Sequence, residues 1–189
     1  MEAFLISTGL VTVAEIGDKT MLLAIVLAAT WRRPVPIILG ILVATLLNHA
    51  LAAIVGSLAA QWLSGPWMRW IIGLAFLAFA AWALVPDTLG ENDTPKTDAR
   101  TDMSVLWATA IAFFMVEMGD KTQVATAALG AQFENIVPVV LGSTLGMMIA
   151  NVPAVYIGGA AAARLPLKWI RMAAAAGFAA TGLWVLLTG

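Results

Sequence analysis

The hexapeptide "EIGDKT", residues 15–20, interrupts an otherwise apolar stretch, and "EMGDKT", residues 117–122, repeats it 102 positions later. Each copy places two carboxylates and a lysine among hydrophobic neighbours. Of all 189 residues, 61% are hydrophobic and only 11% are charged. These fractions, together with a mean hydropathy of +0.93, lie outside the range of soluble domains. The sequence therefore indicates an integral membrane protein that carries charge at two related places.

Six apolar segments are long enough to cross a bilayer as helices, since about 20 residues span ~30 Å of hydrocarbon. Runs such as "MLLAIVLAA" are apolar on every face, whereas the strands of a transmembrane barrel alternate apolar and polar residues. We therefore predict an all-α integral membrane protein with six transmembrane helices. The predicted spans are Ala3–Ala29, Val35–Ala60, Trp67–Val85, Met103–Gly130, Asn135–Ala160 and Lys168–Leu187.

The 102-residue offset aligns more than the hexapeptides, and this predicts a duplicated three-helix unit. Residues 1–85 form the first predicted repeat and residues 103–189 the second, joined by a linker at 86–102 that is rich in Pro, Gly, Asp and Thr. Because three is odd, the second unit enters the membrane from the opposite side, which gives two inverted repeats. The offset also pairs Pro36 with Pro138, Gly40 with Gly142, Trp67 with Trp169 and Arg69 with Arg171.

Lysine and arginine residues near the predicted span ends gather on one side of the membrane, while the other side receives only Arg69. Cytoplasmic loops carry the excess of basic residues. The richer side is therefore predicted to be cytoplasmic, and both termini are predicted to lie outside. The residues on the richer side are Arg32, Arg33, Lys96, Arg100, Arg164, Lys168 and Arg171.

Both hexapeptides fall near the middle of a predicted span, so their carboxylates are expected near the bilayer midplane. Glu and Asp three residues apart share one face of a helix, which predicts that Glu15 and Asp18 point in one direction. The same spacing relates Glu117 to Asp120. In an inverted repeat the two pairs would meet at the midplane, where many secondary transporters bind their substrates.

Four carboxylates at the midplane need compensation, because even one central charge costs about 2.5–3.5 kcal/mol on insertion scales. Lys19 and Lys121 neutralise part of this charge and leave a formal value of −2, which a divalent cation or two protons would balance. Purely structural ion pairs are the alternative, but ionisable residues inside a membrane usually serve function. Gly17 and Gly119 would permit close helix approach or local unwinding.

Other polar residues at similar depth are weaker candidates for the site. Thr20 and Thr122 offer hydroxyl oxygens, and Gln123 offers an amide. Asn48 and Asn151 lie in long apolar segments, where each can give an oxygen to a cation or a hydrogen bond to a carboxylate. The supporting set is thus Lys19, Thr20, Lys121, Thr122, Gln123, Asn48 and Asn151.

Composition narrows the chemistry of the predicted site. The chain has no cysteine, which excludes disulfides and thiolate metal sites, and its net charge of −1 gives no indication of nucleic-acid binding. Its one histidine, His49, is left open as a ligand, a proton carrier or a packed residue. Carboxylate, carbonyl and hydroxyl oxygens suit Mg²⁺, Ca²⁺ and Mn²⁺. The expected partners are a divalent cation and the lipid bilayer.

Two copies of E-x-G-D-K-[ST], one in each half of the chain, resemble the GDT-type family of small cation/proton exchangers. That family includes Golgi calcium/manganese transporters, chloroplast manganese transporters and bacterial manganese exporters, and it is related more distantly to the lysine-exporter superfamily. The resemblance covers nearly the whole chain. It implies export of Mn²⁺, or of Ca²⁺ in some members, in exchange for protons, without a resident cofactor. The residues that it implies as ion ligands are Glu15, Asp18, Glu117 and Asp120.

The predicted function is secondary active export of Mn²⁺ by alternating access. The predicted location is the cytoplasmic membrane of a bacterium, because the compact length of the chain resembles the bacterial branch of the family. A Ca²⁺/H⁺ antiporter of the same family and a passive divalent-cation channel are the alternatives. An amino-acid carrier would also use midplane charge, but four carboxylates suit a metal better than a zwitterion. No substrate-activating group stands out, so transport is predicted rather than catalysis.

Overall fold

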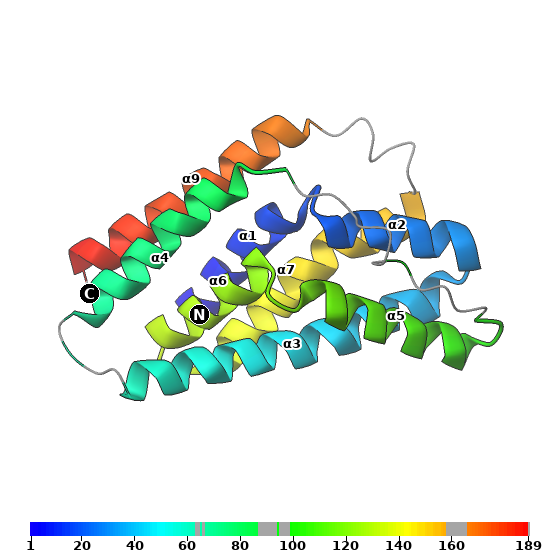
Figure 1. Ribbon diagram of the computed structural model, residues 1–189, viewed down its shortest axis with the longest axis horizontal. Helices are drawn as coiled ribbons and strands as arrows, with labels where there is room; N and C mark the ends of the chain where they lie inside the picture. Colours follow the sequence, from blue (N-terminus) through cyan, green and yellow to red (C-terminus); the bar gives the residue numbers. More distant parts are fainter. Residues whose placement is uncertain (63–64, 66, 87–93, 95–98, 158–165, 189) are drawn as a thin grey trace.

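The computed structural model describes residues 1–62, 65, 67–86, 94, 99–157 and 166–188. Within these residues every regular element is an α-helix, as the sequence predicts. Figure 1 shows the helices extending roughly along one long axis, with both chain ends toward the same end of the bundle. The helices are α1 (Glu2–Glu15), α2 (Lys19–Trp31), α3 (Pro34–Trp62), α4 (Met68–Ala83), α5 (Asp102–Glu117), α6 (Lys121–Gln132), α7 (Ile136–Ile157) and α9 (Leu167–Thr188).

The long apolar helices support a membrane protein. Among the described residues, α3, α7 and α9 are each long and apolar enough to cross a membrane, and α5 with α6 passes the same test as one bent span. The predicted first span is divided between α1 and α2, and the predicted third span corresponds to α4, which has 16 residues. The six-span inverted repeat and its domain boundaries stay predictions. Most of the predicted linker, with Lys96, and Arg164 lie outside the described residues.

The two hexapeptides do not lie on continuous helices. α1 stops at the glutamate of the first hexapeptide and α2 begins at its lysine, and α5 and α6 do the same at the second. Gly17 and Gly119 have φ of +85° and +79°, a left-handed conformation that residues with a side chain disfavour. The expectation that Glu and Asp share one helical face is therefore wrong, because Asp18 and Asp120 are the N-cap residues of new helices. Of the two alternatives for the glycines, close helix approach or local unwinding, the structure shows local unwinding.

The helices before the two breaks cross the long helices at close range. α1 packs on α7, and α5 packs on α3. A Cβ atom added to Gly40 would lie 2.7 Å from the Cβ of Thr109, and one added to Gly142 would lie 3.1 Å from the Cβ of Ser7. Small residues at these positions let the helix backbones approach. The 102-residue offset relates Gly40 to Gly142 and Ser7 to Thr109, so the two crossings correspond.

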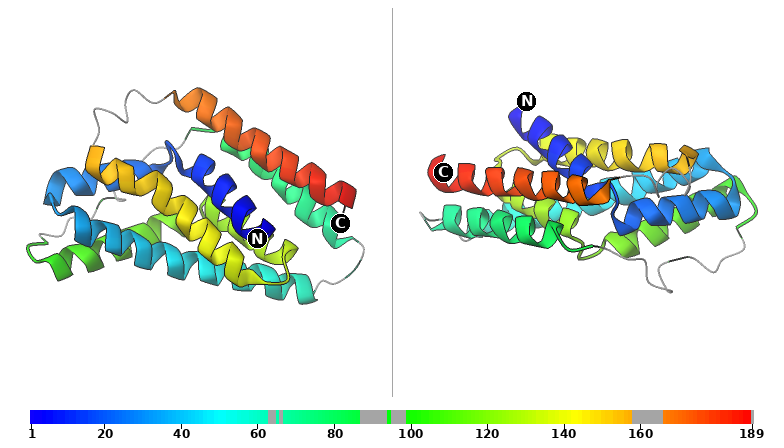
Figure 2. Two further views of the ribbon diagram at one scale, coloured as in Figure 1. Left: turned by 180° about the vertical axis from the view of Figure 1, so that it is seen from behind. Right: turned by 90° about the horizontal axis from the view of Figure 1, so that it is seen from above.

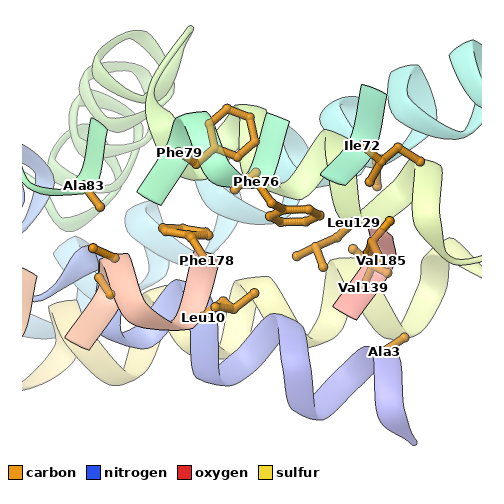
Figure 3. Packing of buried hydrophobic residues seen from close by; sticks show 14 of the residues in the cluster. Ala3, Leu10, Ile72, Phe76, Phe79, Ala83, Leu129, Val139, Phe178 and Val185 are labelled. Atoms are coloured by element: carbon orange, nitrogen blue, oxygen red, sulfur yellow. The ribbon is translucent and has the colours of Figure 1, made fainter. Parts of the chain in front are cut away.

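An aromatic cluster fixes α4 and α9 side by side along one flank of the bundle (Figures 1 and 2). Phe76 and Phe178 stack with ring centroids 6.4 Å apart, and Phe79 meets both rings edge-on. Leu10 of α1 and Leu129 of α6 belong to the same buried cluster (Figure 3). This packing seats the α4–α9 pair against α1 and α6 and sets the beginning of α9 beside the first break.

Candidate metal site

Three buried carboxylates from both halves of the chain meet where the helices are broken. Glu15 ends α1, while Asp18 and Asp120 stand at the N-caps of α2 and α6. All three residues are buried, with at most 3% of their surface exposed. One ligand oxygen from each lies within 4.8 Å of the other two. Neither predicted repeat forms this group alone.

Each lysine pairs with the aspartate of the other hexapeptide. Lys19 Nζ lies 3.2 Å from Asp120 Oδ1, and Lys121 Nζ lies 3.2 Å from Asp18 Oδ1. The side chain of Lys121 is 4% exposed, whereas that of Lys19 is 22% exposed. These crossed ion pairs connect the two breaks, and the sequence spacing of lysine and glutamate within one hexapeptide does not predict them.

Threonine hydroxyls orient the carboxylates from within each hexapeptide. The hydroxyl of Thr20 donates to Glu15 Oε2 at 2.6 Å. The hydroxyl of Thr122 lies within hydrogen-bond distance of Glu117 Oε2, at 3.3 Å, and of Asp120 Oδ2, at 3.1 Å. Both threonines are fully buried. The structure therefore brings both predicted threonines to the carboxylates.

Several carboxylate oxygens at this place have no hydrogen-bond donor within the described part of the chain. They are Glu15 Oε1, Asp18 Oδ2 and Glu117 Oε1, all buried. Glu117 lies outside the three-carboxylate group but interacts electrostatically with Glu15. Leaving a buried acceptor without a partner costs about 1–3 kcal/mol, and more when it is charged. An all-oxygen set of this kind fits a hard divalent cation.

Gln123 supports the second break rather than the carboxylates. Its Oε1 accepts a hydrogen bond from the N–H of Gly119 at 2.6 Å. Its Nε2 donates to Oδ1 of Asn48, which is buried in α3. The two predicted supporting amides therefore join the unwound backbone to a long helix.

Met21 has a corresponding contact at the first break, and sequence reasoning gave it no role. Its Sδ accepts a hydrogen bond from the N–H of Gly17 at 3.4 Å. The 102-residue offset relates Met21 to Gln123, so the same repeat comparison that found the hexapeptides contained this signal.

The contacts of Asn151 and His49 do not connect them to the carboxylates. Nδ2 of Asn151 donates to the backbone oxygen of Met147 at 3.1 Å and lies 3.1 Å from its sulfur. His49 is fully buried, and within the described residues neither ring nitrogen has a hydrogen-bond partner. A ligand role for Asn151 stays a prediction.

Two residues of α9 approach the first break and were not connected with the site by sequence reasoning. A Cβ atom added to Gly17 would overlap the side chain of Leu167. A small cavity next to this contact is lined by Asp18, Lys121 and Arg171, among others. No local pattern reveals such contacts, because they depend on where α9 packs.

Known proteins with similar sequences place this geometry in a family. The family model described as "Divalent cation/proton antiporter GDT1" matches residues 3–91 and 105–189. A Vibrio cholerae serotype O1 protein named "Putative manganese exporter" is 45% identical over 188 residues, covering 99% of this chain and 88% of the relative. No solved structure matches the chain significantly.

Plant proteins extend the similarity. The GDT1-like protein 5 of Arabidopsis thaliana is 26% identical over 223 residues, covering 100% of this chain and 96% of the relative. The chloroplastic PAM71-homolog of Arabidopsis thaliana is 29% identical over 186 residues, covering 83% of this chain and 51% of the relative. With the family model matching both halves and the Vibrio relative matching nearly throughout, this chain belongs to the GDT1 family of divalent cation/proton antiporters.

Proposed function

We propose that this protein exports Mn²⁺ from the bacterial cytoplasm in exchange for protons. The observation that carries the proposal is the buried group of Glu15, Asp18 and Asp120, whose oxygens lie within 4.8 Å of one another. The family supplies the class of transport, divalent cation/proton antiport. The name of the Vibrio cholerae relative favours Mn²⁺ over Ca²⁺ as the cargo.

The formal charge of the site gives a physical reason for exchange. Its four carboxylates and two lysines sum to −2 when all six groups are charged. A bound divalent cation brings this sum to zero, and so do two protons on the carboxylates. A site that holds neither a metal ion nor protons keeps its charge of −2, and this charge is costly inside a bilayer. After releasing the metal, the carrier therefore returns to its starting conformation more readily with two protons bound than with an empty site. This couples the metal flux to the proton flux.

The crossed ion pairs connect ion binding to a change of shape. A cation held by Asp18 and Asp120 competes with Lys121 and Lys19 for the same carboxylates. Loading therefore weakens the contacts that join one break to the other, and unloading restores them. A ligand shifts a conformational equilibrium only by binding one state better. The lysines provide that difference between the loaded and the empty states.

The proposed orientation places both termini outside the cytoplasm. In Figure 1 the two termini lie toward one end of the bundle, and the turn between α2 and α3 lies toward the opposite end. That turn carries Arg32 and Arg33, and basic residues mark the cytoplasmic side. A bacterial cytoplasmic membrane is proposed because the Vibrio relative is bacterial.

The test is transport by purified protein in proteoliposomes. A pH gradient is imposed, and Mn²⁺ and Ca²⁺ are followed in parallel with indicator dyes. Uphill Mn²⁺ movement coupled to proton flow is the expected result, with a smaller response to Ca²⁺. Flux that runs only down the metal's own gradient would establish a channel instead, and uphill movement of Ca²⁺ alone would change the cargo.

The ligand assignment is tested by removing one carboxylate charge at a time. Glu15→Gln and Glu117→Gln are each expected to reduce proton-coupled metal flux to background, because each removes a buried anionic oxygen from the site. Glu2→Gln is the matched control, since Glu2 is exposed at the start of the same helix as Glu15. Wild-type flux from a folded Glu15→Gln or Glu117→Gln protein would refute the assignment.

A further inference from the structure

Leu167, the first residue of α9, covers the backbone at the first break. A Cβ atom added to Gly17 would overlap Cδ2 of Leu167, and the three atoms nearest to it all belong to that leucine. Gly17 immediately precedes Asp18, one of the three carboxylates of the site. The leucine side chain therefore lies directly over the backbone at this point.

A small cavity beside this contact reaches the site itself. Its lining includes Asp18 and Lys121 from the site and Ala83 and Ala174 from the α4–α9 pair. It has room for about one water molecule. Asp18 is 2% exposed, and its Oδ2 has no hydrogen-bond partner in the described part of the chain. The cavity thus reaches a buried carboxylate that can still accept a ligand.

Arg171 adds a positive charge to the same cavity wall. It follows Leu167 by four residues, so the two side chains lie on one face of α9. Arg171 and Lys121 together present two cations next to Asp18. A divalent cation approaching from this side meets an apolar side chain and then like charge, so the route is closed in this conformation.

Within the described part of the chain, the second break has no equivalent cover. The 102-residue offset relates Leu167 to Gly65 and Arg171 to Arg69. Arg69 is exposed, with its guanidinium carbon 5.8 Å from the centroid of the Trp70 ring. A Cβ atom added to Gly119 would meet no atom of the described residues within 4 Å. Among the described residues, a side chain from another helix therefore covers the glycine only at the first break.

We propose that Leu167 is the plug of the ion's route to Asp18. The route runs between α9 and the α1–α2 break and opens when the first turn of α9 moves away, carrying Arg171 with it. Because basic residues mark the side on which α9 begins, this route is the cytoplasmic one. The inference rests on the proposed function, since it assigns a path to the transported cation.

Cysteine labelling tests the plug without measuring transport. The chain contains no cysteine, so Ala174→Cys places a single thiol in the cavity wall. A small anionic methanethiosulfonate, which does not cross membranes, is added on the cytoplasmic side. Leu167→Gly, which introduces the residue found at the related position 65, is expected to raise the labelling rate about tenfold, as for loss of a partly buried leucine contact. Saturating Mn²⁺ is expected to slow it again.

Two further variants keep the result interpretable. Leu167→Ala preserves the helix and is expected to raise labelling in the same direction, while Leu183→Ala removes an exposed leucine of the same helix and is expected to leave the rate unchanged. Equal labelling with and without Leu167, or labelling only from the outer side, would overturn the plug. If wild-type protein in vesicles showed no Mn²⁺/H⁺ exchange, the proposed function would be overturned. A difference in labelling rate between Leu167 and its variants would still show that this side chain closes the route to Asp18.

Discussion

The two breaks carry nearly the same six residues but are supported in different ways. At the first break, Leu167 covers Gly17, whose N–H donates to the sulfur of Met21 at 3.4 Å. At the second break, Gly119 has no cover among the described residues, and its N–H donates to the amide oxygen of Gln123 at 2.6 Å. The difference lies outside the hexapeptides. Closely matched ligand-bearing motifs are therefore held by unequal surroundings.

This difference assigns separate roles to the neighbouring helices. A thioether is a weak acceptor, whereas an amide accepts and donates strongly. Gln123 uses its second group to bond Asn48, so the second break is fixed to α3. The first break depends on α9 for its cover. A shift of α9 would expose one half of the site while leaving the backbone of the other half in place.

The crossed ion pairs give the largest expected contrast between the two halves. Lys121→Met would leave Asp18 buried without its cation, and breaking a buried pair costs about 3–5 kcal/mol. Lys19→Met is expected to cost less, because the Lys19 side chain is 22% exposed and water can partly solvate its partner. Unfolding of both variants by denaturant in detergent micelles would measure this. Equal losses would show that the two pairs are equivalent.

The break glycines give the next contrast. Alanine at Gly17 or Gly119 must adopt positive φ, which costs about 1–2 kcal/mol. Gly17→Ala must in addition displace Leu167, so its loss of stability is expected to exceed that of Gly119→Ala. Adding Leu167→Ala is expected to recover the excess at residue 17 and to change nothing at residue 119. A double-mutant cycle with no coupling between residues 17 and 167 would contradict the cover at the first break.

The sequence predicts the helices of this fold better than the breaks between them. Continuous apolar runs predict helices and a membrane protein, and every regular element of the described residues is a helix. The spacing of Glu15 and Asp18 fits one helical face, yet the chain unwinds between them. A glycine at positive φ commonly ends a helix, but a glycine within an apolar run does not by itself show that the helix ends there.

The candidate site shows the same limit. The cost of charge inside a membrane predicts that the carboxylates need compensating cations. Which lysine compensates which carboxylate depends on how the halves pack, and the pairing of Lys121 with Asp18 crosses between them. Leu167 carries no sequence signal at all, since one leucine at the start of an apolar helix resembles any other. Contacts between distant segments were therefore the part that local patterns did not reveal.

Exchanging the two supports gives the sharpest form of the comparison. Gln123→Met removes the amide from both Gly119 and Asn48 and is expected to lower the free energy of unfolding by about 1–3 kcal/mol. Met21→Gln offers the N–H of Gly17 a stronger acceptor and is expected to raise the free energy of unfolding by about 0.5–1.5 kcal/mol.

A matched control separates these effects from the chemistry of the substitution. Gln61→Met alters an exposed glutamine near the end of α3 and is expected to stay within about 0.5 kcal/mol of wild type. Denaturant unfolding in detergent measures all three variants. If Gln123→Met matched Gln61→Met, the amide would not fix the second break, and the greater dependence of the first break on α9 would lose its basis. If Gln123→Met is destabilised and Met21→Gln stabilised, the break that α9 covers is also the one with the weaker support of its own.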